Sequence, residues 1–195
     1  MNVFADHSFG FFNLWLLMLL YALPILVTVV CRRGVFRPTT SRFASSRNRR
    51  EYLLFIASKM TMLVYFLYSV VLPMHLDTVV VLVGLVVYML GFIFYLAAWI
   101  TIAASGGAKV ISNGPYRVSR HPVYLSSAVC FVGAGVVSGS IVYLGLSILV
   151  GASHMRNALA EEKICLETYG DEYRRYAAGT PRWLGCPVRA QNKHI

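Results

Sequence analysis

The sequence predicts an all-α fold: a polytopic membrane helical bundle of about five transmembrane helices, with a C-terminal helical hairpin and a cytoplasmic amphipathic tail. Of its 195 residues, 57% are hydrophobic and 13% are charged, whereas soluble domains are typically about 45–50% apolar and about 25% charged. Long apolar runs also alternate with basic segments. Residues 1–195 are therefore expected to form a single membrane domain with no separate soluble catalytic domain.

Five apolar segments are expected to cross the bilayer, which requires roughly 20 largely apolar residues for a helix. Residues 9–31, 52–74 and 79–104 meet this requirement. The apolar stretch 123–154 is too long for one crossing and too short for two with a full loop. Because serine and glycine favour turns, Ser138-Gly139-Ser140 divides it into a hairpin of 123–137 and 141–155, whose second helix should continue into polar sequence.

The basic residues predict the orientation of these segments. Residues 32–50, 105–122 and the tail 156–195 contain 17 of the 18 Lys and Arg residues. Five crossings place all three segments on one face, and the positive-inside bias makes that face cytoplasmic. The sequence therefore predicts a multi-pass integral membrane protein with its N-terminus outside and its C-terminus in the cytoplasm.

The same charges do not indicate a nucleic-acid partner, because no fold that reads nucleic acid accompanies the Arg-rich segment 32–50. That segment is better explained as topogenic and facing anionic lipids. The four cysteines have no metal-binding spacing, and no disulfide or metal site is expected. The oligomeric state is left open.

Two features inside the apolar runs need an explanation. Lys59 lies within the second run, where an ionisable residue is a functional hypothesis by default, although it could also snorkel or pair near a helix end. Gly135 and Gly139 match GxxxG, but a turn with tight hairpin packing is favoured over a dimer motif.

The connection 105–122 ends in a polar cluster. Pro122 suits the first position of a helix, so Arg120 and His121 are expected at a helix N-terminus on the cytoplasmic side. Unpaired backbone N–H groups there favour an anion, and an arginine adds a bidentate clamp. The alternative is anchoring to lipid headgroups by Arg, His and Tyr side chains.

A second polar cluster follows the fifth apolar segment. Glu161 and Glu162 could bind hydroxyl groups, as carboxylates bind a ribose, or a cationic group; the alternative is a solvated helix start. Further on, the i, i+3, i+7, i+10 spacing places four residues on one face of a continued helix: Leu166, Tyr169, Tyr173 and Tyr176. With Trp183 and Leu184, they predict a segment that lies on the membrane or caps a site.

Together these motifs resemble a known family. Gly114-Pro-Tyr-Arg-x-x-Arg120-His-Pro-x-Tyr124, followed by Glu161-Glu162 and Gly170-Asp-Glu-Tyr-x-x-Tyr176, is similar to the isoprenylcysteine carboxyl methyltransferase and phospholipid methyltransferase superfamily. The resemblance covers roughly residues 109–183. It implies a small helical membrane bundle that binds S-adenosylmethionine between the cytoplasmic ends of the last helices and the C-terminal segment, here 105–122 and 156–195. It also implies methyl acceptors that enter from the lipid.

The resemblance implies roles for individual residues. Arg120, His121 and Tyr124 would hold the amino-acid end of the cofactor, and Glu161 and Glu162 would take the ribose hydroxyls or the cofactor amine. Val110 and Ile111 would lie near the adenine, Tyr116 would line the site, and Arg156 would orient an anionic acceptor group. The residues expected to act in catalysis are Arg156, Glu162 and His121.

The acceptor and two other functions stay open. A carboxylate acceptor of the isoprenylcysteine type needs only alignment and desolvation, whereas a phospholipid amine must lose a proton to a base, for which Glu161, Glu162 or His121 could serve. The expected partners are therefore a lipophilic or prenylated substrate and membrane lipids. The alternatives are a membrane reductase of the sterol type that uses NADPH, and a non-enzymatic lipid-binding member of the family.

Overall fold

The computed structural model describes residues 10, 12–31, 49–74, 79–106 and 110–185. The α-helices in these ranges are α1 (Trp15–Cys31), α3 (Arg49–Ser69), α4 (Val79–Ser105), α5 (Pro122–Val137), α6 (Ile141–Tyr169) and α7 (Asp171–Gly179), and η1 (Gly114–Arg117) is a short 3-10 helix. No strand forms in the described ranges beyond one isolated bridge between Asn13 and Pro73. The all-α prediction is confirmed.

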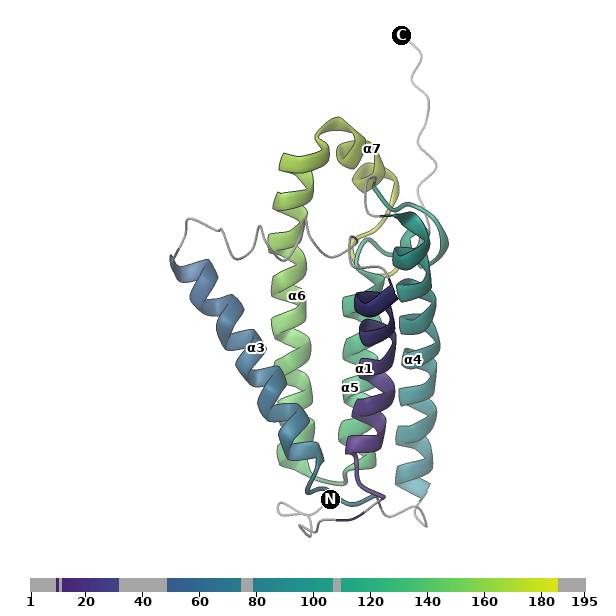
Figure 1. Ribbon diagram of the computed structural model, residues 1–195, viewed down its shortest axis with the longest axis vertical. Helices are drawn as coiled ribbons and strands as arrows, with labels where there is room; N and C mark the ends of the chain where they lie inside the picture. Colours follow the sequence, from purple (N-terminus) through teal and green to yellow (C-terminus); the bar gives the residue numbers. More distant parts are fainter. Residues whose placement is uncertain (1–9, 11, 32–48, 75–78, 107–109, 186–195) are drawn as a thin grey trace.

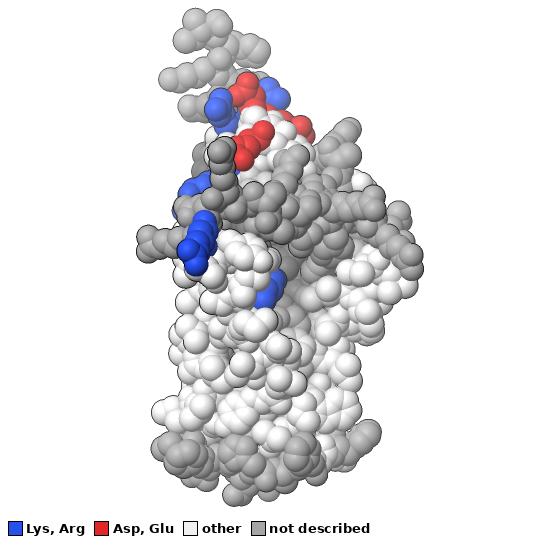
Figure 2. Space-filling view, turned by 60° about the vertical axis from the view of Figure 1, so that its left-hand side comes forward, with Lys and Arg blue, Asp and Glu red and all other residues white. Residues whose placement is uncertain are grey.

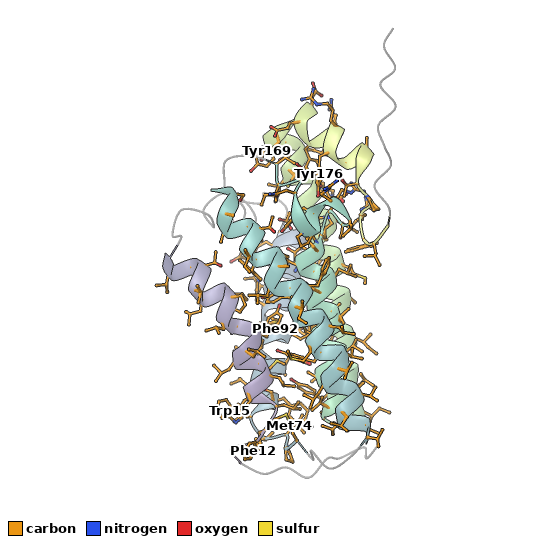
Figure 3. All side chains as sticks on the ribbon, turned by 90° about the vertical axis from the view of Figure 1, so that its right-hand side faces the viewer. Phe12, Trp15, Met74, Phe92, Tyr169 and Tyr176 are labelled. Atoms are coloured by element: carbon orange, nitrogen blue, oxygen red, sulfur yellow. The ribbon has the colours of Figure 1, made fainter. Side chains whose placement is uncertain are left out.

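The long helices run along one axis and alternate in direction (Figure 1). Helices α1, α4, α5 and α6 lie alongside one another, whereas α3 is inclined, and α7 folds over one end, which we call the α7 end. Tyr169 and Tyr176 lie at the α7 end, and Phe12, Trp15 and Met74 lie at the opposite end (Figure 3). The start of α5 and the ends of α1, α4 and α6 thus lie towards the α7 end. The start of α3 points the same way but lies apart from them (Figure 1).

The surface of the bundle is apolar along most of its length. Tyr52–Ser69 and Val79–Ser105 are long and apolar enough to cross a membrane, and Trp15–Val30 and Pro122–Val137 are shorter apolar helices. Charged side chains gather towards the α7 end, and most of the remaining face in view is uncharged (Figure 2). Crossing by all five predicted segments stays a prediction.

The first two predicted segments have wrong boundaries at the end opposite α7. Helix α1 begins at Trp15 rather than residue 9, and α3 ends at Ser69 rather than residue 74. Between them, the Leu14 amide donates to the Leu72 carbonyl at 3.0 Å, and the Asn13 side chain donates to the Val70 carbonyl at 2.7 Å. These residues use their polar groups to join the two segments, so neither helix extends through them.

The boundaries predicted for the third segment and for the first helix of the hairpin agree with those of α4 and α5 to within one residue. Gly139 has a φ of +60° in the turn, and the Ser140 side chain caps α6 by accepting from the Tyr143 amide. A Cβ on Gly135 would approach the Leu144 and Ser147 side chains to 2.8 Å. These two glycines serve the turn and the tight hairpin, as predicted.

The contact between α4 and α5 depends on close backbone approach. A Cβ on Gly133 would lie 2.5 Å from the Tyr88 amide nitrogen, and one on Gly84 would lie 2.7 Å from the Val137 amide nitrogen. Only glycine allows such an approach. This interface therefore holds η1 and the start of α5 in a fixed position relative to α4.

Buried tyrosines join the remaining helices. The Tyr65 hydroxyl on α3 donates to the Phe131 carbonyl on α5 at 3.1 Å, and the Tyr88 hydroxyl on α4 donates to the Leu17 carbonyl on α1. The Tyr21 hydroxyl lies 2.9 Å from Ser127 Oγ on α5. A buried phenol combines a large apolar ring with a hydrogen bond, so each of these three contacts joins two helices and satisfies its own hydroxyl group.

The continued amphipathic helix is wrong. Helix α6 extends beyond Arg156 to Tyr169, as predicted, but Gly170 then adopts φ +52° and ψ −121°. This conformation is available essentially to glycine alone, and α7 starts in a new direction at Asp171. Leu166 is exposed, whereas Tyr173 is buried, so the four spaced residues do not share one face.

Candidate functional site

The first part of the site is the loop that leads into α5. Pro122 is the first residue of α5 and His121 is its N-cap, as the sequence predicts. The His121 amide is satisfied by Ser119 Oγ at 3.1 Å, which fixes the backbone just before the helix. Arg120 and His121 therefore project from a rigid turn at the α7 end.

Glu162 on α6 joins this loop through a cluster of cations. Its Oε1 lies 3.1 Å from Arg120 Nη1 and 3.1 Å from His121 Nε2. The Arg182 guanidinium binds both carboxylate oxygens, with Nε 3.0 Å from Oε1 and Nη2 2.9 Å from Oε2. The side chain of Glu162 is only 10% exposed, so three donors surround a nearly buried carboxylate.

These contacts determine the charges in the cluster. Burial alone would raise the pKa of Glu162, but the hydrogen bonds from Arg182 and His121 and the charge of Arg120 hold it below its usual value. Burial lowers the pKa of His121, against the hydrogen bond to Glu162 that raises it. At neutral pH a neutral imidazole therefore faces an ionised carboxylate, so His121 Nε2–H donates and Nδ1 carries the lone pair.

Glu161 has a different environment from its neighbour. Burial raises the pKa of its carboxyl, a hydrogen bond with Tyr124 opposes this shift, and the charge of Glu162 adds to it. Burial also raises the pKa of the Tyr116 phenol, and the charge of Glu161 contributes to that shift. Tyr116, Tyr124 and Glu161 thus form a second group beside the Glu162 cluster.

The segment after α7 completes the site. The Arg120 amide donates to the Pro181 carbonyl at 2.9 Å, and the Gly185 amide donates to the Val118 carbonyl at 3.3 Å. The ring centroids of Trp183 and His121 are 5.8 Å apart. Residues 180–185 therefore lie along the loop before α5 and bring Arg182 to Glu162.

Helix α7 covers the same loop. The Tyr176 hydroxyl donates to the Tyr116 carbonyl at 2.8 Å, and the ring centroids of Tyr173 and Tyr176 are 5.9 Å apart. Tyr173 is 5% exposed. In the described structure these two residues cap η1, which corresponds to the second of the two roles expected for the tail.

The structure brings most of the predicted residues together. Arg120, His121 and Glu162 share the cation cluster, and Tyr116, Tyr124 and Glu161 lie beside it. Val110 and Ile111 are partly buried in the segment before η1, and Arg156 is partly buried on α6. The roles expected for these last three residues stay predictions.

Two residues of the site are absent from the sequence-based set. Arg182 was counted only as a basic residue of the tail, and nothing in the sequence pairs it with Glu162, 20 positions away. His154 lies within an apolar run, yet its ring centroid is 5.5 Å from that of Tyr124. Its spacing of seven residues from Glu161 on one helix was the available signal, because seven residues are about two helical turns.

Glu162 was expected to bind a cofactor hydroxyl or amine, but its oxygens already accept from Arg120, His121 and Arg182. A ligand would have to compete with those donors, so Glu162 is better suited to positioning Arg120 and His121. Glu161 forms no ion pair within the described ranges. No group of three or more His, Cys, Asp or Glu residues in those ranges could hold a metal ion.

A comparison with protein families gives one match to report. The model of the phospholipid methyltransferase family matches residues 76–172. This range contains α4, η1, α5 and α6 and ends at the start of α7, so it includes Arg120, His121, Glu161 and Glu162 but not Arg182. No curated protein matches the chain.

Proposed function

We propose, from the premise that residues 76–172 belong to the phospholipid methyltransferase family, that this protein transfers a methyl group from S-adenosylmethionine to a lipophilic acceptor. Membership in this family implies a membrane-integral methyltransferase that acts on lipid-type substrates. The cofactor, the acceptor and the residues that bind them are the proposed part. The reaction would take place at the cytoplasmic membrane interface.

The observation that carries the proposal is the gathering of polar residues at the α7 end. Arg120, His121 and Tyr124 come from one segment, and Glu161 and Glu162 come from another about 40 residues later. Hydrogen bonds and ion pairs join the two segments. A cluster of this kind at the end of an apolar bundle gives a polar ligand access to a lipid-soluble partner.

The chemistry of these residues fits S-adenosylmethionine. Nε of Arg120 is buried and has no hydrogen-bond partner among the described residues, so it could donate to the carboxylate of the cofactor, where the N-terminus of α5 also favours an anion. Glu161 has an oxygen acceptor for the ribose hydroxyls or the amine. When bound, the cofactor would supply an electrophilic methyl group on its sulfonium.

Glu162 and Arg182 have a supporting role in this proposal. The carboxylate holds Arg120 and His121 by contacts of 3.1 Å, so both side chains are oriented before a ligand arrives. Such preorganisation lowers the entropic cost of binding. We therefore assign Glu162 and Arg182 as positioning residues, and Arg120, Tyr124 and Glu161 as contacts to the cofactor.

The need for a base depends on the acceptor. A carboxylate acceptor is already ionised and needs alignment and exclusion of water. A phospholipid amine must lose a proton, which His121 Nδ1 or the Glu161 carboxylate could accept. Arg156 would orient an anionic group of the acceptor in either case.

The membrane topology is part of the proposal. The alternating directions of α1, α3, α4, α5 and α6 (Figure 1) are compatible with five crossings. The α7 end would then face the cytoplasm, with the N-terminus outside, since the basic segments prefer that side.

The direct test is incubation of the purified protein with methyl-labelled S-adenosylmethionine and total membrane lipid, followed by identification of the labelled product. We expect label in a lipid-soluble product with the wild type and with Glu167→Gln, an exposed acid on the same helix. Glu161→Gln should weaken cofactor binding roughly tenfold, as expected for loss of a charge-assisted hydrogen bond. Binding of NADPH instead of S-adenosylmethionine, or of neither, would contradict the proposal.

A further inference from the structure

Lys59 is a charged residue in an apolar part of the bundle. It is the only Lys, Arg, Asp or Glu within Tyr52–Ser69, and α4, α5 and residues 141–155 of α6 contain none. Its Nζ lies 5.1 Å from the centroid of the Phe55 ring. No carboxylate among the described residues forms an ion pair with Lys59, although intramembrane charges normally pair or line a polar path.

His154 on α6 is a second polar residue in this part of the bundle. Lys59 is close enough to act electrostatically on the His154 imidazole. The His154 ring lies between Tyr124 and Phe131 of α5, with centroid distances of 5.5 Å and 5.6 Å. Its Nδ1 is buried and has no hydrogen-bond partner in the described part of the chain, which is costly unless a ligand satisfies it.

Neighbouring hydrogen bonds fix the helices that carry these residues. Asn157 Nδ2 on α6 donates to Ser58 Oγ on α3 at 3.0 Å, and Ser58 Oγ donates to Ser153 Oγ at 3.3 Å. Ser58 precedes Lys59, and Ser153 precedes His154. The cross-link therefore holds both side chains in register, while α3 inclines away from α6 towards the α7 end (Figure 1).

His154 is close to the proposed cofactor site. The Tyr124 ring contacts His154 on one side, and its centroid lies 5.9 Å from that of His121. Tyr124 also hydrogen-bonds Glu161. A group held at His154 would thus be separated from the proposed reaction centre by a single aromatic ring.

We propose that Lys59 and His154 form a subsite for the phosphate of a phospholipid acceptor. Lys59 supplies the positive charge and His154 supplies a donor if its proton is on Nδ1. The occupant is a lipid phosphate because Lys59 is exposed on the apolar surface, where lipids are the available ligands. Of the two acceptor classes that the sequence leaves open, the phospholipid amine carries such a group apart from the atom that is methylated.

This inference rests on the proposed function for the identity of the acceptor, but the binding step can be measured alone. The protein in micelles of the nonionic detergent dodecyl maltoside, which carry no phosphate, is titrated with phosphatidic acid and, in parallel, with diacylglycerol that has the same acyl chains. We expect Lys59→Met and His154→Phe each to weaken phosphatidic acid binding by roughly tenfold. Binding of diacylglycerol should be unchanged in both variants, and binding of S-adenosylmethionine should be unchanged in Lys59→Met.

Two further variants control for charge and for folding. Lys163→Met removes the same charge from an exposed position on α6 and should bind phosphatidic acid like the wild type. Lys59→Arg keeps the charge and should retain binding to within about twofold, as a point charge of the same sign remains. Equal losses in Lys59→Met and Lys163→Met would mean general surface attraction and would overturn the proposal, as would full binding by Lys59→Met.

Methylation kinetics distinguish the acceptor from a bulk membrane lipid. With total membrane lipid as the source of acceptor, Lys59→Met should raise KM for lipid and leave KM for S-adenosylmethionine unchanged. An unchanged KM for lipid, despite weaker phosphatidic acid binding, would identify a structural lipid and overturn the acceptor subsite. A wild type that binds no S-adenosylmethionine, yet binds phosphatidic acid through Lys59, would contradict the proposed function and support the anion subsite.

Discussion

Two helix interfaces of this bundle are built in opposite ways. Between α4 and α5, a Cβ on Gly133 would lie 2.5 Å from the Tyr88 amide, so backbone meets backbone. Between α3 and α6, the Ser58 hydroxyl accepts from Asn157 Nδ2 at 3.0 Å and donates to Ser153 Oγ at 3.3 Å, and α3 is inclined (Figure 1). The first interface is a close contact of two backbones, whereas the second is made by polar side chains.

The difference matches what each interface would do. The α4–α5 pair carries η1 and the turn at His121, which must stay in place for the Glu162 cluster to form. The α3–α6 pair carries Lys59, which is exposed on the apolar surface, and His154, which is partly buried. By our proposal, the half of the bundle with the close backbone contact would hold the cofactor, and the half with the side-chain contacts would receive the lipid.

The largest expected effect comes from adding a methyl group to the close interface between α4 and α5. Gly133→Ala should destabilise the protein by about 3 kcal/mol, because overpacking against backbone cannot relax by side-chain rotation. Gly145→Ala is the matched control, since a Cβ there meets nothing within 4 Å, and it should be neutral or stabilising. Thermal unfolding in detergent measures both, and equal effects would contradict the described approach of α4 and α5.

The next effect is the loss of the carboxylate that joins the two polar segments. Glu162→Gln should cost about 2 kcal/mol, because Arg120 loses its partner in a partly buried position, while the more exposed Arg182 contributes little. It should also weaken cofactor binding by releasing Arg120 and His121. Urea unfolding in detergent and titration with S-adenosylmethionine test this, with Glu167→Gln as the exposed control.

A smaller effect is expected at the polar interface between α3 and α6. Asn157→Ala removes the donor to Ser58 and should cost about 1 kcal/mol, the usual net value of a hydrogen bond. Unlike Gly133→Ala, it should leave S-adenosylmethionine binding unchanged, because α4, η1 and the start of α5 are not disturbed. Weakened cofactor binding in a folded Asn157→Ala protein would show that the two halves are not separable.

Acid should destabilise the Glu162 cluster through His121 and Glu162, because both have a lowered pKa in the folded protein. The pKa of His121 is below 6.5 in the folded protein, so below about pH 6.5 the unfolded chain binds a proton that the folded one does not, and stability falls. The pKa of Glu162 is below 4.5, so its contribution is present above that pH and is lost as the pH falls further. His121→Gln should remove the part of the loss that begins near pH 6.5 in melts at several pH values.

Local signals in the sequence predicted much of this arrangement. Hydropathy and Pro122 defined α4, α5 and the hairpin, because helix starts and apolar length depend on neighbouring residues. Arg120, His121 and Glu162 were expected at one site, and they form one cluster. The contacts of Arg182 and the inclination of α3 were not predicted, since both depend on how distant segments pack.

Where the prediction was wrong, a single residue usually decided the structure. Gly170 interrupts the expected amphipathic helix because its positive φ turns the chain. The spacing of the apolar residues does not reveal such a break. Asn13 likewise bonds to Val70, and α1 begins only after it, at Trp15. The ligand-binding role expected for Glu162 stays a prediction, and the sequence did not indicate that the Arg182 guanidinium binds both of its carboxylate oxygens.

The central claim, that the cluster at the α7 end binds S-adenosylmethionine, is tested most directly by photo-crosslinking of the methyl-labelled cofactor. The purified protein is irradiated with the label, digested and mapped by mass spectrometry. Label should appear within residues 116–124 or 154–162 and should be lost with an excess of unlabelled cofactor. Label confined to other segments, or none that competes with unlabelled cofactor, would contradict the account.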